Sequence, residues 1–165
     1  RPRATEIVDV EDLITATVAL HEDLMKPKRI TVHLQTVLRH GDDQPLRVRG
    51  NFQDLQQVLT NVLLNARDAV SENGNIWISV ADEGERVVIR VRDDGKGIPE
   101  DIIGRIFDPL VTTKRGQGGT GLGLAISRRL VHACDGDITV ASTPGSGAEF
   151  SIVLLRSEKT VGSMQ

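Results

Sequence analysis

QDLQQVLTNVLLNARDAV, residues 53–70, is the stretch that decides the fold of this chain. At about 100° per residue, its leucines, valines and alanines fall on one broad arc, which predicts an amphipathic helix packed on a core. The arc consists of Leu55, Val58, Leu59, Val62, Leu63, Ala66, Ala69 and Val70. A polar stripe runs beside it at spacings of three and four residues and consists of Asp54, Gln57, Asn61, Asn65 and Asp68. Because asparagine is a mediocre helix former, Asn61 and Asn65 one turn apart indicate either a solvated helix face or a bound ligand.

The composition argues against several classes of protein. The chain has 165 residues, enough for one domain with its own core, and its 20 basic and 23 acidic residues give a net charge of −3. With 2% aromatic residues and no basic stripe, it does not have the pattern of a nucleic-acid-binding protein. The single cysteine, Cys134, has no CxxC motif or Cys/His cluster around it, so we expect a small buried side chain in a reducing compartment.

The organisation of the chain is expected to be simple. One folded domain is predicted over residues 1–156, followed by a frayed tail at 157–165. No run of apolar residues approaches the roughly 20 needed to cross a bilayer, so we expect a cytoplasmic fragment without membrane contact.

Hydrophobic periodicity along the chain predicts an α+β fold. Helical spacing indicates three main helices and a shorter one, at residues 13–24, 53–70, 120–133 and 102–106. Alternating patterns indicate strands at residues 5–10, 29–37, 46–49, 75–81, 86–92, 137–141 and 148–155. Helices packed on one face of a mixed, mostly antiparallel sheet form a two-layer α/β sandwich.

A glycine-bearing segment follows the strand predicted at 86–92. In Asp93-x-Gly95-x-Gly97 the glycines would let the backbone approach a ligand, and the carboxylate could accept a hydrogen bond from an exocyclic amine such as that of adenine. The same motif also fits an ordinary turn.

A second glycine-rich segment precedes the last predicted helix. In the run from Gly119 to Leu124, GTGLGL, the free N–H groups of the first helical turn would face a ligand such as phosphate. The run is neither a Walker A motif nor a Rossmann fingerprint. Close packing of the helix on the sheet is the alternative explanation for its glycines.

Four motifs in register resemble one known family. They are Asn61-x-x-x-Asn65, Asp93-x-Gly95-x-Gly97, Ile106-Phe107-Asp108-Pro109 with Thr112-Thr113-Lys114, and Gly119-Thr120-Gly121-Leu122-Gly123-Leu124. In this order they resemble the N, G1, F and G2 boxes of the catalytic ATP-binding domain (HATPase, Bergerat or GHKL fold) of two-component sensor histidine kinases. The resemblance covers about residues 5–155 and is nearest to the nitrogen-regulation and dicarboxylate-sensor branch.

The resemblance implies roles for individual residues, with ATP and Mg²⁺ as cofactors. Asn65 would hold the magnesium ion that bridges the ATP phosphates, and Asn61 would support the metal and the phosphates. Asp93 would accept the adenine amino group. The pocket floor and the wall near the base would be formed by Gly95, Gly97 and Ile98.

The resemblance also implies a mobile ATP lid. Lys114 could neutralise the phosphates and would join Asn61 and Asn65 as a catalytic residue, while Phe107 would anchor the lid. Wrapping of the phosphates is assigned to Gly119, Gly121 and Gly123. Further expected cofactor contacts are Asp68, Thr113, Thr120, Leu122 and Leu124.

Two positions bear on the type of reaction. ATPases of the same fold carry a general-base Glu where this chain has Asn61, and an amide cannot usefully take a proton. The resemblance therefore favours a histidine kinase that transfers the ATP γ-phosphate to a histidine on a separate dimerisation domain, which then supplies a response regulator. His21 resembles a phosphoacceptor only superficially, since strands and not a second long helix follow it.

Two alternative functions stay open at this point. One is an ATP-driven conformational ATPase of the same fold, and the other is a non-catalytic nucleotide-binding interaction module. Because dimerisation in the family belongs to the separate domain, the isolated chain is expected to be a monomer.

Overall fold

The structure is a computed structural model that describes residues 3–35, 44–111 and 123–157. Its helical elements are α1 (Val10–Leu20), α2 (Glu22–Met25), the 3-10 helix η1 (Lys26–Lys28), α3 (Phe52–Ala69), α4 (Glu100–Ile103) and α5 (Gly123–Ala133). Its strands are β1 (Glu6–Asp9), β2 (Thr31–Leu34), β3 (Arg47–Gly50), β4 (Asn75–Asp82), β5 (Arg86–Asp93), β6 (Asp137–Ser142) and β7 (Ala148–Leu155).

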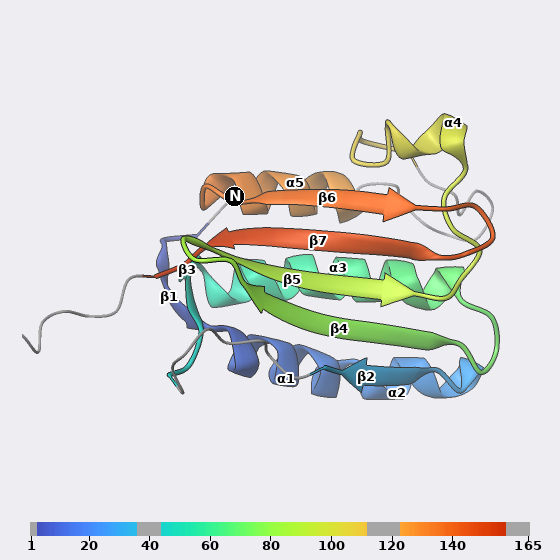
Figure 1. Ribbon diagram of the computed structural model, residues 1–165, viewed down its shortest axis with the longest axis horizontal. Coiled ribbons are helices and arrows are strands. Elements are labelled where there is room, and N and C mark those ends of the chain that lie inside the picture. Colours follow the sequence, from blue (N-terminus) through green and yellow to red (C-terminus); the bar gives the residue numbers. More distant parts are fainter. Residues whose placement is uncertain (1–2, 36–43, 112–122, 158–165) are drawn as a thin grey trace, which may run out of the picture.

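One layer of the molecule is a five-stranded sheet, and α1, α3 and α5 lie together on one of its faces (Figure 1). The strand order is β2-β4-β5-β7-β6, in which only the β2–β4 pair is parallel. The predicted two-layer α+β sandwich with a mostly antiparallel sheet is therefore confirmed. Strands β1 and β3 do not join this sheet but pair with each other in a separate antiparallel ribbon.

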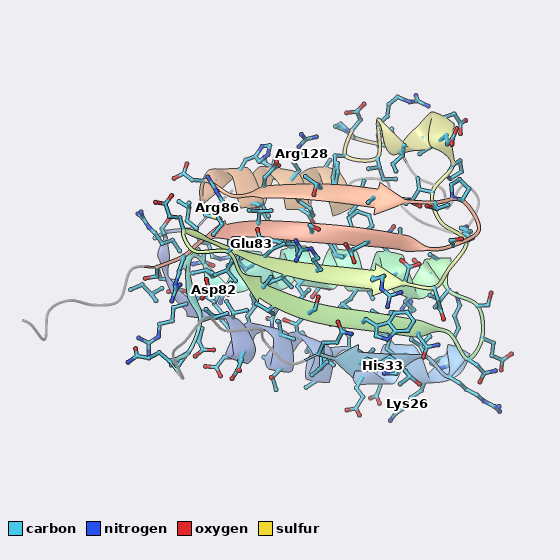
Figure 2. All side chains as sticks on the ribbon, in the orientation of Figure 1. Lys26, His33, Asp82, Glu83, Arg86 and Arg128 are labelled. Carbon is cyan, nitrogen blue, oxygen red and sulfur yellow. The ribbon has the colours of Figure 1, made fainter. Side chains whose placement is uncertain are left out.

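Alternation along the central strands places the core between the two layers. In β4, Ile76, Ile78 and Val80 are buried under the helices, as expected for a sheet with one covered face. By the same alternation Trp77 faces the other side of the sheet, where it stacks on His33 of β2 with ring centroids 5.4 Å apart. His33 is labelled in Figure 2. The Arg92 guanidinium lies 4.0 Å from the centre of the Trp77 ring, so an aromatic and cation–π stack covers part of the outer face.

Helix α3 runs through the centre of the core. Val58 and Val62 are completely buried, and the side chain of Asn51 caps the helix by accepting a hydrogen bond from the Asp54 N–H at 3.1 Å. At the other end, Lys28 Nζ donates to the carbonyls of Arg67 and Val70 at 2.9 and 3.0 Å. A positive charge at a helix C-terminus is stabilising because it meets the negative end of the helix dipole.

Asp54, at the start of the polar stripe of α3, has a structural role that is separate from Asn61 and Asn65. Asp54 is only 4% exposed and receives two hydrogen bonds from Arg3, one from the backbone N–H at 2.8 Å and one from Nη1 at 2.7 Å. This carboxylate therefore anchors the N-terminal segment on α3. Asn61 and Asn65 lie two and three turns further along the helix.

Several predicted boundaries differ from the structure. The short helix expected over 102–106 is found at Glu100–Ile103. The helix expected over 13–24 is interrupted at His21, whose ring forms a 2.8 Å hydrogen bond with Thr60 Oγ1 of α3. The strand expected from residue 29 begins at Thr31, because Arg29 adopts a left-handed conformation with φ of 53°. No helix within residues 3–35, 44–111 and 123–157 is long and apolar enough to cross a membrane.

Candidate functional site

The candidate site lies where the C-terminal end of α3 meets the segment that follows β5. The Lys96 N–H donates to the Ala69 carbonyl at 3.1 Å. A Cβ on Gly95 would lie 2.4 Å from that same carbonyl oxygen, so only glycine permits this approach. The glycine segment predicted from the sequence is thus placed one helical turn beyond Asn65.

Asp93 is the buried carboxylate of this region. It is 1% exposed, and its Oδ1 accepts a hydrogen bond from the Gly95 N–H at 2.8 Å. Burial raises the pKa of Asp93, because removal from water disfavours the ionised form; hydrogen bonds from the Gly95 and Ala148 N–H groups oppose this shift. The arrangement holds an acceptor inside the protein at the end of β5.

The turn between β6 and β7 braces the same segment. Gly97 has φ of +74°, and a Cβ there would lie 2.6 Å from the Thr143 carbonyl oxygen. The Ile98 N–H donates to Ser142 Oγ at 2.8 Å, and the Ile98 side chain is 6% exposed. Sequence reasoning treated 143–147 only as a turn and missed Ser142 as a support, because nothing local connects it with residues 93–98.

Asn65 is half-buried in the last turns of α3. Its side-chain amide forms no hydrogen bond with any other described residue. The described part of the chain thus occupies neither the oxygen nor the nitrogen of this amide, and an amide can both accept a hydrogen bond from a ligand and donate one to it.

Asn61, one turn earlier, has a different environment. Its Nδ2 donates to the Gly123 carbonyl at 3.0 Å and to Ser127 Oγ at 2.9 Å, both on α5. A Cβ on Gly123 would lie 3.6 Å from Asn61 Cγ, an ordinary contact. Packing against the described residues therefore does not explain the glycine at 123, whereas it does explain those at 95 and 97.

Three further predicted contacts have described positions. Phe107 packs edge-on against Phe150 of β7 with ring centroids 6.2 Å apart, and the Arg128 guanidinium of α5 lies 5.3 Å from its ring centre. Asp68 pairs with Arg67 at 3.1 Å, and Leu124 packs on the edge of the core.

The remaining predictions lie outside the described residues. They are Thr113, Lys114, Gly119, Thr120, Gly121, Leu122 and nearly all of the expected lid and tail. Cys134, expected to be buried, is half-buried and donates its thiol to the Val131 carbonyl; burial raises its pKa.

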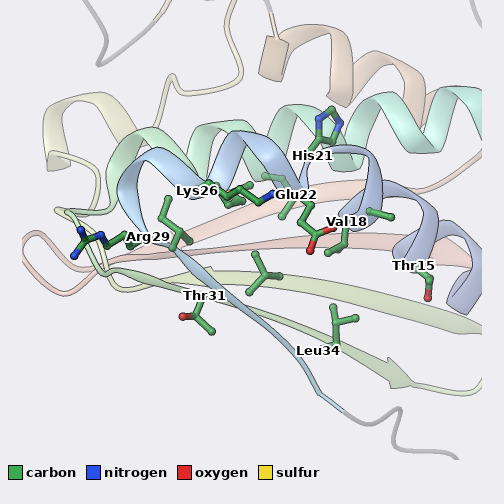
Figure 3. Close-up of a pocket in the computed structure, with 13 residues that line it drawn as sticks. Thr15, Val18, His21, Glu22, Lys26, Arg29, Thr31 and Leu34 are labelled. Atoms are coloured by element: carbon green, nitrogen blue, oxygen red, sulfur yellow. The ribbon is translucent and has the colours of Figure 1, made fainter.

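A cavity of about 720 Å³ lies elsewhere, between α1, α2 and β2 (Figure 3). Val18, Met25, Ile30 and Val32 form much of its apolar wall, and His21 lies on its rim. None of the predicted site residues lines it. No group of three or more His, Cys, Asp or Glu side chains within the described ranges is placed to hold a metal ion.

Comparison with known proteins identifies relatives of this arrangement. Residues 50–158 match the family described as histidine kinase-, DNA gyrase B-, and HSP90-like ATPase. The alginate biosynthesis sensor protein KinB of Pseudomonas aeruginosa is 36% identical over 146 residues, which are 88% of this chain and 24% of KinB. The signal transduction histidine-protein kinase AtoS of Escherichia coli K12 is 42% identical over 114 residues, which are 68% of this chain and 18% of AtoS. The chain thus spans about a quarter of KinB and less of AtoS.

Solved structures share the fold. The catalytic domain of the histidine kinase ThkA, in a nucleotide-free form, superposes with a TM-score of 0.81 at 28% identity, covering 93% of this chain and 97% of that domain. ThkA in complex with the response regulator protein TrrA gives a TM-score of 0.76 at 27% identity, covering 93% of this chain and 42% of ThkA.

Proposed function

This chain belongs to the histidine kinase-, DNA gyrase B-, and HSP90-like ATPase family, and on that premise we propose that it is the ATP-binding catalytic domain of a sensor histidine kinase. In this proposal it presents the γ-phosphate of ATP to a histidine on a separate dimerisation domain of the same kinase. The phosphoryl group then passes to a response regulator, a partner supported by the complex of the related ThkA with TrrA.

The observation that carries the proposal is the amide of Asn65, which forms no hydrogen bond with the other described residues. It lies one turn from Asn61 and one turn before Ala69, whose carbonyl receives the N–H of Lys96 in the Asp93 segment. A nucleotide whose base reaches Asp93 could therefore extend its phosphates along the same end of α3. Buried Asp93 would accept the adenine amino group, and Ile98 would pack beside the base.

Magnesium fits the donor set at Asn65. An amide oxygen is a hard ligand, and Mg²⁺ commonly uses few protein ligands together with substrate phosphates and water. The bound ion would neutralise charge on the phosphates during transfer. Asn65 would hold the ion through Oδ1.

The environment of Asn61 favours transfer over hydrolysis. Its amide nitrogen is engaged by two acceptors of α5, and the amide oxygen cannot remove a proton from water. An ATPase of this fold would need a base at that position. Phosphoryl transfer to an imidazole has less need of one, because the attacking nitrogen is already neutral and carries a lone pair.

His21 is excluded as the acceptor in this proposal. Its Nε2 is held at 2.8 Å by Thr60 Oγ1, and burial lowers the pKa of its ring. The acceptor is assigned to another domain, and we propose that the isolated chain is a monomer that works in the cytoplasm, where ATP is available.

The test is a calorimetric titration of the 165-residue chain with ATP, with and without magnesium, followed by analysis for phosphohistidine and released phosphate. We expect magnesium-dependent binding, no stable phosphohistidine and little phosphate release. Rapid phosphate release would favour the conformational ATPase. Absence of binding under both conditions would favour an interaction module that has lost nucleotide binding.

A further inference from the structure

We propose that Ser127 is a positioning residue that fixes the amide of Asn61 so that its oxygen faces the bound nucleotide. The inference rests on the proposed function, because it assigns a role to the same ATP site. It concerns a residue that belongs to none of the four sequence motifs.

Ser127 lies in a cluster of three polar groups that are within hydrogen-bonding distance of one another. Ser127 Oγ lies 2.8 Å from the Gly123 carbonyl, four residues earlier in α5, and 2.9 Å from Asn61 Nδ2. Asn61 Nδ2 also lies 3.0 Å from that carbonyl. Three groups therefore meet in one small cluster between α3 and α5.

The hydrogen positions in this cluster follow from chemistry. A carbonyl oxygen only accepts, so the side of the Asn61 amide that faces Gly123 must be the nitrogen. The hydroxyl proton of Ser127 goes to the same carbonyl, which leaves an oxygen lone pair of Ser127 to accept from Asn61 Nδ2. The amide nitrogen of Asn61 is then held by two neighbouring acceptors of α5, and Oδ1 accepts no hydrogen bond from any described residue.

Burial makes this arrangement specific. Ser127 is 0% exposed, so water does not compete for its hydroxyl. An asparagine amide otherwise turns easily about its last torsion and can present either nitrogen or oxygen. Ser127 and the Gly123 carbonyl together hold the nitrogen of Asn61 against α5 and turn its oxygen away from α5. An oxygen acceptor suits a magnesium ion or a water bound to it and does not suit a bare phosphate oxygen.

The inference predicts a metal-dependent defect. Ser127→Ala removes one of the two acceptors that hold Asn61 Nδ2, so affinity for Mg·AMPPNP should fall about three- to tenfold, the usual size of one hydrogen bond. Affinity for AMPPNP without magnesium should change by less than about twofold. In an Asn61→Ala background, Ser127→Ala should have no further effect, because its target is absent.

The control for Ser127→Ala removes another buried hydroxyl that makes the same type of hydrogen bond within a helix. Thr17 in α1 is also 0% exposed and donates to the carbonyl four residues earlier, Leu13, at 2.6 Å. Thr17→Val removes this bond while keeping the shape of the side chain. It should lower stability to a similar extent and leave nucleotide affinity unchanged.

A spectroscopic measurement tests the same contact without nucleotide. The side-chain amide protons of Asn61 should shift and exchange faster with solvent in Ser127→Ala, as seen by NMR. If alanine prevents folding, Ser127→Cys fills the same space with a weaker acceptor and should give a smaller change in the same direction.

The outcomes are distinguishable. Three results would each overturn the role of Ser127: additive effects of Ser127→Ala and Asn61→Ala, equal losses of affinity with and without magnesium, or an unchanged NMR signal of the Asn61 amide. If the wild-type chain still binds Mg·AMPPNP, the proposed function stays intact. Failure of the wild-type chain to bind Mg·AMPPNP would overturn the proposed function and the inference with it.

Discussion

Gly147 lies directly against the backbone of Asp93, so that a Cβ at 147 would stand 2.0 Å from the Asp93 carbonyl oxygen. The turn between β6 and β7 therefore packs directly against the end of β5, next to the buried carboxylate of Asp93. Gly145, two residues earlier, has a similar positive φ, +83° against +87°, but a Cβ there would meet no atom within 4 Å.

These two glycines form a matched pair for a stability measurement. Gly145→Ala should cost about 1–2 kcal/mol, the strain of a left-handed alanine. Gly147→Ala should cost about 1–3 kcal/mol more, because it adds a clash that must displace the backbone. Urea unfolding of both variants measures the difference, and equal losses would show that the contact with Asp93 is easily relieved.

Asn65→Ala tests the proposed magnesium ligand. We expect affinity for Mg·ATP to fall about tenfold or more, since an interaction with a charged group is lost, while metal-free ATP binding changes little. Gln57→Ala is the control, because Gln57 is exposed in the same polar stripe two turns earlier. Equal losses with and without magnesium would contradict the assignment.

Asp93→Asn tests recognition of the base. The carboxylate is a pure acceptor, whereas an amide carries both a donor and an acceptor, so the preference for ATP over GTP should narrow by about tenfold. Competition of the two nucleotides for one fluorescent analogue measures the ratio. Asp94→Asn removes an adjacent, exposed charge that bonds Asn75 and should leave the ratio unchanged. A ratio unaltered in both variants would remove Asp93 from base recognition.

His21 should give the protein a defined pH dependence. Burial, followed by the charge of Arg67, lowers the pKa of the folded-state ring below 6.5. As the pH falls below 6.5 the unfolded state binds the proton first, so stability should decrease until the folded-state pKa is passed. Above 6.5 this contribution is constant. Denaturant titrations from pH 5 to 8 should show this loss in wild type and not in His21→Gln, and parallel curves would refute it.

Much of the fold follows from local sequence. The helix at 53–70, the hairpin of β4 and β5 and the last strand pair were predicted close to their observed bounds, since periodicity and turn residues act over a few positions. Interruptions were not predicted. The break at His21 depends on Thr60, a residue of another helix, and the left-handed Arg29 carries no signal in its own neighbourhood.

Some residues of the candidate site could also be predicted from the sequence, and others could not. Asn61 and Asn65 share a helix, and Asp93, Gly95 and Gly97 share one segment, so their spacing was visible in the chain. Ser142 and Ser127 were missed because they reach the site from 44 and 66 residues away in sequence. The need for glycine at 95 could not be predicted either, because it comes from the Ala69 carbonyl, which is distant in sequence.

The sequence alone determined the α+β class, the amphipathic central helix and the order of the four motifs, because each depends on residues within one or two turns or strands. Only the tertiary structure decided that β1 and β3 form their own ribbon, that Asp54 holds Arg3, and that Ser127 engages Asn61. Those outcomes are pairings between distant segments. They are set by which buried polar groups and strand edges can satisfy one another once the core has formed.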